Sequence, residues 1–212
     1  MNKYIFAIVI LVLVIAVAAY FVGDEPSKLT APVVVSESVD PSTLPGIITG
    51  TSTPWAPELS HLRERLVAIG LPALADEGTK MHTHQHLDIW IHGSVVAVPA
   101  GVGVSNADHF ISPVHTHDGT GEIHVESPTV QTFTLGQFFD IWGIAFSKEG
   151  IGGYRVGNGN ELYIYVNGKE LAAGTNPRAF ALAPHQEIAV IFGLPTEIPA
   201  TIPSAYDFKS GM

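Results

Sequence analysis

The sequence predicts an α+β domain, with one main helix packed on a small mixed sheet, that follows an N-terminal transmembrane helix and a flexible stalk. Two observations predict this organisation. An unbroken apolar run covers residues 4–22, and it is long enough to cross a bilayer as a helix. Further along, segments with strand-like patterning surround a single strongly hydrophobic helical segment. With 212 residues and 46% hydrophobic content, the chain can bury one core.

The apolar run predicts a single-pass membrane anchor over residues 1–23. Lys3 precedes the run and favours a cytoplasmic N-terminus, which places the rest of the chain on the extracytoplasmic side. Ala16 and Ala18 also provide the small-x-small pattern of a signal-peptidase site, and cleavage there would leave the domain secreted. We favour the uncleaved anchor because the apolar run continues to Val22.

The composition changes twice after the anchor. Residues 24–56 are rich in Pro, Ser, Thr, Val and Glu without a lasting period, which predicts a flexible stalk. Residues 57–194 carry the periodic segments of a histidine-rich domain, and residues 195–212 form a Pro-rich tail. The chain has no cysteine, so disulfides and thiolate ligands are excluded. Its net charge of −10 argues against a nucleic-acid partner, and no motif indicates a protein partner.

The first predicted element of the domain is an amphipathic helix over residues 57–69. Apolar residues recur there every three or four positions, and Pro57 and Gly70 suit its first turn and its end. The charged residues 63–65 are predicted to lie on its polar side. His61, on the same helix, is predicted to be a surface residue.

Strand patterning and turn residues predict most of the remaining elements. Tight turns are expected at residues 93–94 and 167–168, where Gly or Asn-Gly separates apolar segments. Residues 99–113 and 150–160 are predicted to be loops because they are rich in glycine and show no lasting period. The predicted strands are residues 84–92, 95–98, 122–126, 162–166 and 187–192.

The main helix is predicted to begin after Thr134. Thr134 and Gln137 have the spacing of a capping box, and Gly143 suits the end of the helix. Because this helix is strongly hydrophobic, it must pack on the sheet. The succession of hairpin, strand, helix, strand and strand resembles the β-grasp architecture, which implies one face of the sheet under the helix and the other face open to solvent.

Eight of the ten histidines fall between residues 81 and 126. Alternate side chains of a strand share a face, so His82, His84 and His86 are predicted to point one way while the apolar residues of that strand point inward. His115 and His117 repeat the pattern further along the chain. We therefore expect the imidazoles to converge on the uncovered face of the sheet.

Two His-x-His pairs and a His-Val-Glu run on one face predict a metal site, because neutral imidazole is a common ligand of transition metals. Nitrogen and oxygen donors without cysteine favour Zn(II) or Cu(II), and they also suit Fe(II) or Ni(II). The predicted ligands are His84, His86, His115, His117 and His124. Further candidates, as ligands or as partners that orient the imidazoles, are His82, Asp88, His109, Glu122 and Glu126.

The predicted function is metal capture, sensing or delivery, and three different functions stay open beside it. His115, His117 and Glu122 fit the ligand core of the first cupin motif, a resemblance that implies a metal-dependent oxygenase or hydrolase. The flanking glycines and the second motif of the cupins are absent, so binding is favoured over catalysis. The remaining two functions are an interaction module whose histidines hold no metal and a pH sensor built from the same imidazoles.

Several longer motifs run through the predicted domain, at residues 70–74, 82–87, 98–103, 115–118, 123–128, 133–143 and 166–169. Together they resemble a family of histidine-rich exported or membrane-anchored prokaryotic domains. The resemblance covers about residues 66–193 and implies the domain boundaries, but no activity. It also implies a cysteine pair near the Gly-Gly-Tyr loop, and Gly150 and Arg155 stand at those places in this chain.

Overall fold

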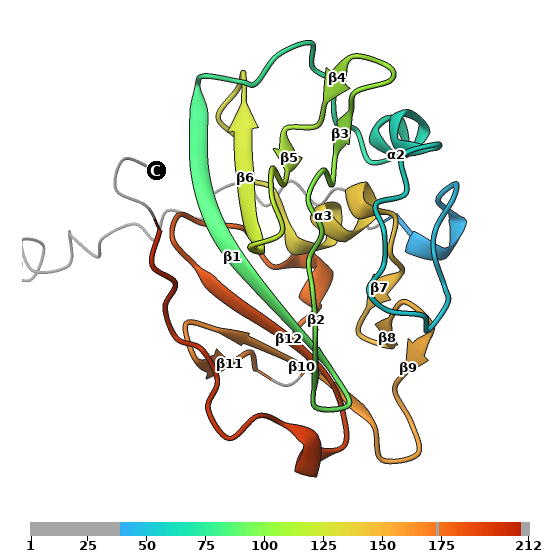
Figure 1. The fold of residues 1–212 in the computed structure, drawn as a ribbon, viewed down its shortest axis with the longest axis vertical. Helices are drawn as coiled ribbons and strands as arrows, with labels where there is room; N and C mark the ends of the chain where they lie inside the picture. The colour runs from blue at the N-terminus through green and yellow to red at the C-terminus, as the bar shows by residue number, and fades with distance from the viewer. Residues whose placement is uncertain (1–38, 173, 209–212) are drawn as a thin grey trace, which may run out of the picture. The chain divides into compact units, whose positions relative to one another are not determined.

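The structure, a computed structural model, describes residues 39–172 and 174–208. The predicted membrane anchor and the first part of the predicted stalk lie outside the described residues. Within the described ranges, no helix is long and apolar enough to cross a membrane. The described chain folds as a mixed α/β unit in which helices pack on a sheet of several strands (Figure 1), so the predicted α+β class is confirmed.

Seven strands form the main sheet, and two smaller sheets flank it. The main-sheet strands are β1 (Met81–Ile91), β2 (Ser94–Val96), β5 (Val114–His115), β6 (Glu122–Ser127), β10 (Glu161–Val166), β11 (Lys169–Glu170) and β12 (Glu187–Gly193). They follow the order β11-β10-β12-β1-β6-β5, and β2 pairs with β1 beside this row. The smaller sheets contain β3 (Val104–Ser105) and β4 (Phe110–Ile111), and β7 (Phe146–Ser147), β8 (Gly150–Ile151) and β9 (Tyr154–Arg155).

The small sheets correct the prediction of two structureless loops. Both segments form strands of only two residues, which are too short to produce a recognisable period of two in the sequence. The turn between β1 and β2 also differs by one position, because His92 and Gly93 adopt φ values of 49° and 73°. Two successive positive φ angles are what a two-residue hairpin turn of type I′ requires.

Strand β1 is the longest of the main sheet and occupies its centre (Figure 1). Its first half, as far as His86, pairs antiparallel with β6. From His86 onwards it pairs parallel with β12, the last strand of the described chain. Leu87 and Ile89 point into the core and are fully buried, as the alternation of the sequence predicts.

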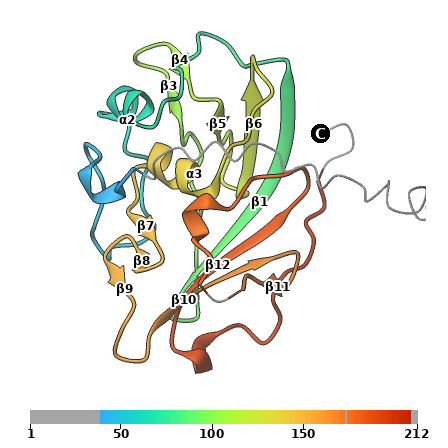
Figure 2. The same ribbon diagram turned by 180° about the vertical axis from the view of Figure 1, so that it is seen from behind.

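The described residues form two α-helices, α2 (Leu62–Ala68) and α3 (Leu135–Trp142). Helix α3 lies against one face of the main sheet (Figure 2) and is almost entirely buried. The predicted capping box is present, since Thr134 accepts from the amide of Gln137 and Gln137 accepts from the amide of Thr134. Gly143 ends the helix at a φ of 88°, as predicted for a left-handed residue after a helix.

Helix α2 is shorter than predicted, and one of its charged residues lies in the core. The helix begins at Leu62. The residues from Pro57 to Leu59 belong instead to an irregular segment, in which the Glu58 amide donates to the carbonyl of Trp142 at the end of α3. Arg65 is fully buried, not exposed on a polar face. Its guanidinium donates to the carbonyl of Asp140 at 2.7 Å and to that of Ile141 at 3.1 Å, the carbonyls at the negative end of α3.

The second part of the predicted stalk, residues 39–56, packs on the domain. Leu44 and Trp55 belong to the buried core. Ile48 donates to the carbonyl of Gly143 at 2.8 Å and accepts from the amide of Ala145 at 3.1 Å. The sequence did not predict this packing, because the segment is largely polar. Two buried side chains and a short β-bridge produce no periodic pattern in the sequence.

A buried ion pair holds the other side of α3. Asp140 is almost completely buried and receives two bonds from the Arg178 guanidinium, at 3.0 and 2.7 Å. Arg178 also donates to the carbonyl of Phe146 at 3.0 Å. Arg178 follows Pro177 in one of the short 3₁₀ turns, which lie at Pro41–Thr43, Pro177–Ala179 and Pro195–Glu197.

Replacing Arg178 with Ala should lower the free energy of unfolding by about 3 kcal/mol or more, because it leaves the buried Asp140 carboxylate without its partner. Urea unfolding at pH 7 measures the change. Lys148→Ala is the control, since it removes an exposed ion pair with Glu149 and should change stability by less than about 0.5 kcal/mol. Equal effects of the two substitutions would contradict the prediction.

Candidate metal centre

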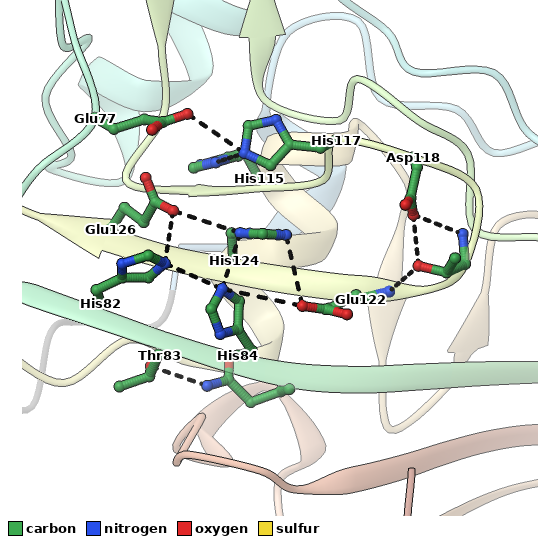
Figure 3. A network of polar contacts seen from close by, with 12 residues as sticks. Glu77, His82, Thr83, His84, His115, His117, Asp118, Glu122, His124 and Glu126 are labelled. Carbon is green, nitrogen blue, oxygen red and sulfur yellow. Dashed lines mark hydrogen bonds and ion pairs between the residues drawn. The ribbon is translucent and has the colours of Figure 1, made fainter. Parts of the chain in front are cut away.

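Three histidines lie side by side across the main sheet. His84 of β1 is paired with His124 of β6, and His124 is in turn paired with His115 of β5. Residues directly opposite one another on adjacent strands share a face and stand close together. The next pair along β1 and β6 joins His82 to Glu126. The register therefore places one row of imidazoles, followed by an imidazole–carboxylate pair, on the side of the sheet opposite the apolar core (Figure 3).

Four donor atoms on β1 and β6 form a closed ring of short contacts. The Nε2 atoms of His82 and His84 are 3.1 Å apart, and His84 Nε2 lies 3.1 Å from His124 Nδ1. Glu126 Oε1 completes the ring at 3.0 Å from His82 Nε2 and 3.4 Å from His124 Nδ1. A tetrahedral zinc ion with bonds of about 2.0–2.1 Å separates its nitrogen ligands by roughly 3.3 Å, so these contacts have the size of a metal coordination shell.

A second group overlaps the first. His115 Nε2 lies 3.1 Å from His117 Nε2, and these residues, with His124 and Glu126, can each place a ligand atom within 4.8 Å of the others. Glu77 Oε1 lies 3.4 Å from His117 Nε2 at the outer edge. The two His-x-His pairs therefore flank the His-Val-Glu run of β6, which is shared. These groups of histidine and acidic residues could hold a metal ion.

Hydrogen bonding and burial leave the inner imidazoles neutral. His115 Nδ1 donates to the carbonyl of Ser112 at 2.9 Å, which leaves the lone pair on Nε2 free to bind a metal. Burial, then the charge of His117, lowers the pKa of His115 to about 4. Burial, then the charge of His84, lowers the pKa of His124 to about 3, and burial followed by His82 lowers the pKa of His84. Neutral imidazole is the form that coordinates metals.

The carboxylates of the cluster lie in different environments. Burial and the neighbouring charge of Glu77 raise the pKa of Glu126 to about 7. Glu122 is buried, and its Oε1 lies 3.8 Å from His124 Nε2 and 4.0 Å from His84 Nε2. This oxygen has no hydrogen-bond partner among the described residues. Glu122 therefore lies beside the imidazoles and outside both groups of closely spaced ligand atoms.

The predicted open face is largely buried at the cluster. His84 is 1% exposed and His115 is 0% exposed, because the imidazoles pack on one another with ring centroids 4.4–5.5 Å apart. The outer residue of each His-x-His pair stays in contact with solvent, since the side chains of His82 and His117 are 56% and 44% exposed. The cluster thus has a closed interior and an open rim.

Three of the predicted candidates lie away from this cluster. His86 shares the parity of His82 and His84, but its two ring nitrogens contact Glu187 and the carbonyl of Thr120, both at 2.8 Å. Asp88 lies near His86 and not near the row of imidazoles. His109 is exposed, with a φ of 52°, and belongs to neither overlapping group of the cluster. The structure brings together His82, His84, His115, His117, His124 and Glu126.

Two acidic residues of the region were not singled out by the sequence pattern. Glu77 precedes β1 in an irregular segment and so carries no strand parity. Glu187 begins β12 and lies opposite His86 in the parallel register. The sequence does show that Glu187 is a charged residue at the start of an otherwise apolar strand. Its partner, His86, could not be identified without the strand order. His61, predicted to be a surface residue, has a side chain that is 45% exposed and is hydrogen-bonded to Glu58. His92 is hydrogen-bonded to Glu197.

Comparison of the chain with protein-family models, curated proteins and solved structures gives no significant match. The resemblance to histidine-rich exported domains therefore stays a prediction, and the functional argument depends on the geometry of the site.

In the metal-free protein, His115→Gln should become more stable relative to the unchanged protein as the pH falls from 6.5 to 4. The unfolded chain protonates His115 below its ordinary pKa of 6.5, whereas the folded state holds that pKa at about 4. The unfolded state therefore binds more protons in this window, which lowers the stability of the unchanged protein by at most about 1.4 kcal/mol for each pH unit.

Urea unfolding with a chelator at pH 7, 6 and 5 measures this difference. His92→Gln is the matched control, because it removes a histidine that bonds Glu197 outside the cluster. A difference between His115→Gln and the unchanged protein that does not vary with pH would contradict the prediction.

Proposed function

We propose that this protein is a membrane-anchored, extracytoplasmic domain that captures a divalent transition-metal ion in its histidine cluster and delivers it. The observation that carries this proposal is the closed ring of contacts among His82, His84, His124 and Glu126, at 3.0–3.4 Å. Four donors from two strands approach one another at the separations that a bound ion imposes on its ligands.

The donor set suits Zn(II) or Cu(II). The imidazole nitrogens and one carboxylate match the preferences of these ions, and the chain has no cysteine to provide thiolate. A hydrogen-bonded cluster without metal is less favourable, because each neutral imidazole carries only one N–H while three ring nitrogens meet at His84 Nε2. An ion bound at His84 Nε2 satisfies several lone pairs at once.

We propose that the cluster holds one ion tightly. The two overlapping groups share His124 and Glu126. An ion bound to one group therefore takes half of the ligands of the other, and a second ion should bind much more weakly. The two groups can also serve as alternative positions for the same ion.

The rim of the cluster provides a route for exchange. His82 and His117 are its solvent-exposed ligands, while His84 and His115 lie inside. A cavity of about 550 Å³ lies next to this rim and shares Glu77 with it. Asp76 and Glu77 line this cavity, and acidic side chains at an opening attract cations. Ligands that exchange with water at the rim permit capture from solution and transfer to a partner.

The proposed location depends on the sequence. The apolar run of residues 4–22 would anchor the domain to the cell membrane, with the histidine cluster on the extracytoplasmic side. Cleavage after the small-residue pattern near Ala18 would release the same domain instead.

Replacing His124 with Ala should abolish Zn(II) binding at the histidine cluster, because His124 belongs to both overlapping groups. Loss of a residue that only orients a metal ligand raises the dissociation constant of the metal roughly 10–100-fold. Because His124 is itself a proposed ligand, we expect a larger rise in the dissociation constant for Zn(II). Elemental analysis and competition titration of the full-length protein, purified without a histidine tag, provide the measurement.

His92→Ala is the control for this experiment, since His92 lies on the turn after β1 and bonds Glu197. Circular dichroism of each metal-free variant checks the fold. Equal affinities of His124→Ala and the unchanged protein would refute the proposed function.

A metal-dependent oxygenase or hydrolase is the second candidate function, and the cavity beside Glu77 is the observation that favours it, because a substrate needs space next to the ion. The cupin-like version would require His115, His117 and Glu122 at one ion. Glu126, and not Glu122, accompanies the two histidines in the closely spaced group. We therefore favour binding and delivery over catalysis.

We also propose that the sheet is β-grasp-like. This assignment is supported by the parallel pairing of β1 with β12 at the centre of the sheet and by the antiparallel pairing of β10 with β12. It is further supported by helix α3, which follows β6 and precedes β10 in the chain.

A further inference from the structure

A second group of possible ligands lies where β1 changes partners from β6 to β12. His86 and Asp88 are two positions apart on β1, so their side chains lie on the same face of the strand. Glu187 stands opposite His86 at the start of β12. His86 Nδ1 lies 2.8 Å from Glu187 Oε2 and 4.0 Å from Asp88 Oδ2. The three residues can each place a ligand atom within 4.8 Å of the others, and none of them belongs to either group of the histidine cluster.

The orientation of His86 directs one nitrogen at the two carboxylates. Its Nε2 lies 2.8 Å from the carbonyl of Thr120, which can only accept, so Nε2 carries the proton. A histidine that donates one N–H to a backbone carbonyl and presents its other nitrogen is the usual arrangement of a metal ligand. Gly121 permits this approach, because a Cβ there would lie 2.6 Å from the carbonyl oxygen of Leu87 and 3.0 Å from His86 Nε2.

Glu187 provides an independent sign that a cation belongs here. Its side chain is 1% exposed, and its Oε1 is buried without a hydrogen-bond partner among the described residues. Burying a carboxylate is costly unless a charge or hydrogen bonds compensate for the lost water. A single imidazole faces both Glu187 and Asp88, whose side chain is partly open to solvent at 27%. A divalent cation would balance both carboxylates at once.

We propose that His86, Asp88 and Glu187 form a second divalent-cation site, separate from the histidine cluster. One imidazole nitrogen with two carboxylates is a harder donor set than the cluster provides, so this site is better suited to Mn(II) than the cluster is. Tyr206 stacks on the His86 ring, with centroids 3.9 Å apart and planes at 7°, so the C-terminal segment covers one side of the site. The partly exposed Asp88 leaves a path for the ion and for coordinating water.

The test measures Mn(II) binding to the full-length protein by the loss of the electron paramagnetic resonance signal of free Mn(II). His124→Ala is the background, because it removes the ligand shared by both groups of the cluster and leaves the second site intact. We expect this variant to bind one Mn(II) per chain. Adding Glu187→Gln, which keeps the size of the side chain, should raise the dissociation constant at least 10-fold, and Asp88→Asn should do the same.

Glu170→Gln is the matched control, since it removes one negative charge from an exposed position on β11 and should leave the affinity unchanged. Asp88→Asn keeps the test valid if Glu187→Gln does not fold, because Asp88 is partly exposed. Absence of saturable Mn(II) binding in the His124→Ala background, or equal affinities of Asp88→Asn and Glu170→Gln, would overturn the proposal. His86 and Glu187 would then form an imidazolium–carboxylate ion pair without a bound cation. Neither outcome depends on the histidine cluster binding metal.

Discussion

The lateral alignment of His84, His124 and His115 on three neighbouring strands is the constraint on which the site depends. A shift of one residue in either pairing would turn every side chain of the shifted strand to the opposite face. Ile123 and Val125 prevent such a shift, because they alternate with the cluster residues of β6 and are completely buried in the core. The hydrophobic core and the histidine cluster are therefore opposite faces of the same strand pairing, and the core fixes the geometry of the cluster.

Burial opposes the charged forms of both the imidazoles and the carboxylate of the cluster. Burial and neighbouring imidazoles lower the pKa values of His115 and His124, whereas burial and Glu77 raise that of Glu126. Both effects reduce charge in the metal-free state. A divalent ion reverses the balance, because it stabilises the carboxylate and uses the imidazole lone pairs. Arg65 and Arg178 make their buried interactions around α3, outside the cluster.

Local signals in the sequence predicted much of the fold. The Thr134–Gln137 capping box and the parity of the His-x-His pairs each depend on residues close together in the chain, and the structure contains both. The structure departs from the predicted arrangement where distant segments meet. Arg65 is buried because it binds carbonyls of α3, and His86 leaves the cluster because β12 provides Glu187. Neither partner can be identified without the strand order and the packing of the helices.

The parallel pairing of β1 with β12 joins segments that are far apart in the chain, whereas the antiparallel pairing of β1 with β6 joins segments that are closer together. His84 and His124 are 40 positions apart, whereas His86 and Glu187 are 101 positions apart. Contacts between near segments form before contacts between distant ones, because the chain loses less entropy in closing the shorter loop. During synthesis, β1 and β6 would thus meet before β12 has been synthesised. A metal ion encountered at that stage would join the nascent strands, so metal supply would influence how the polypeptide matures.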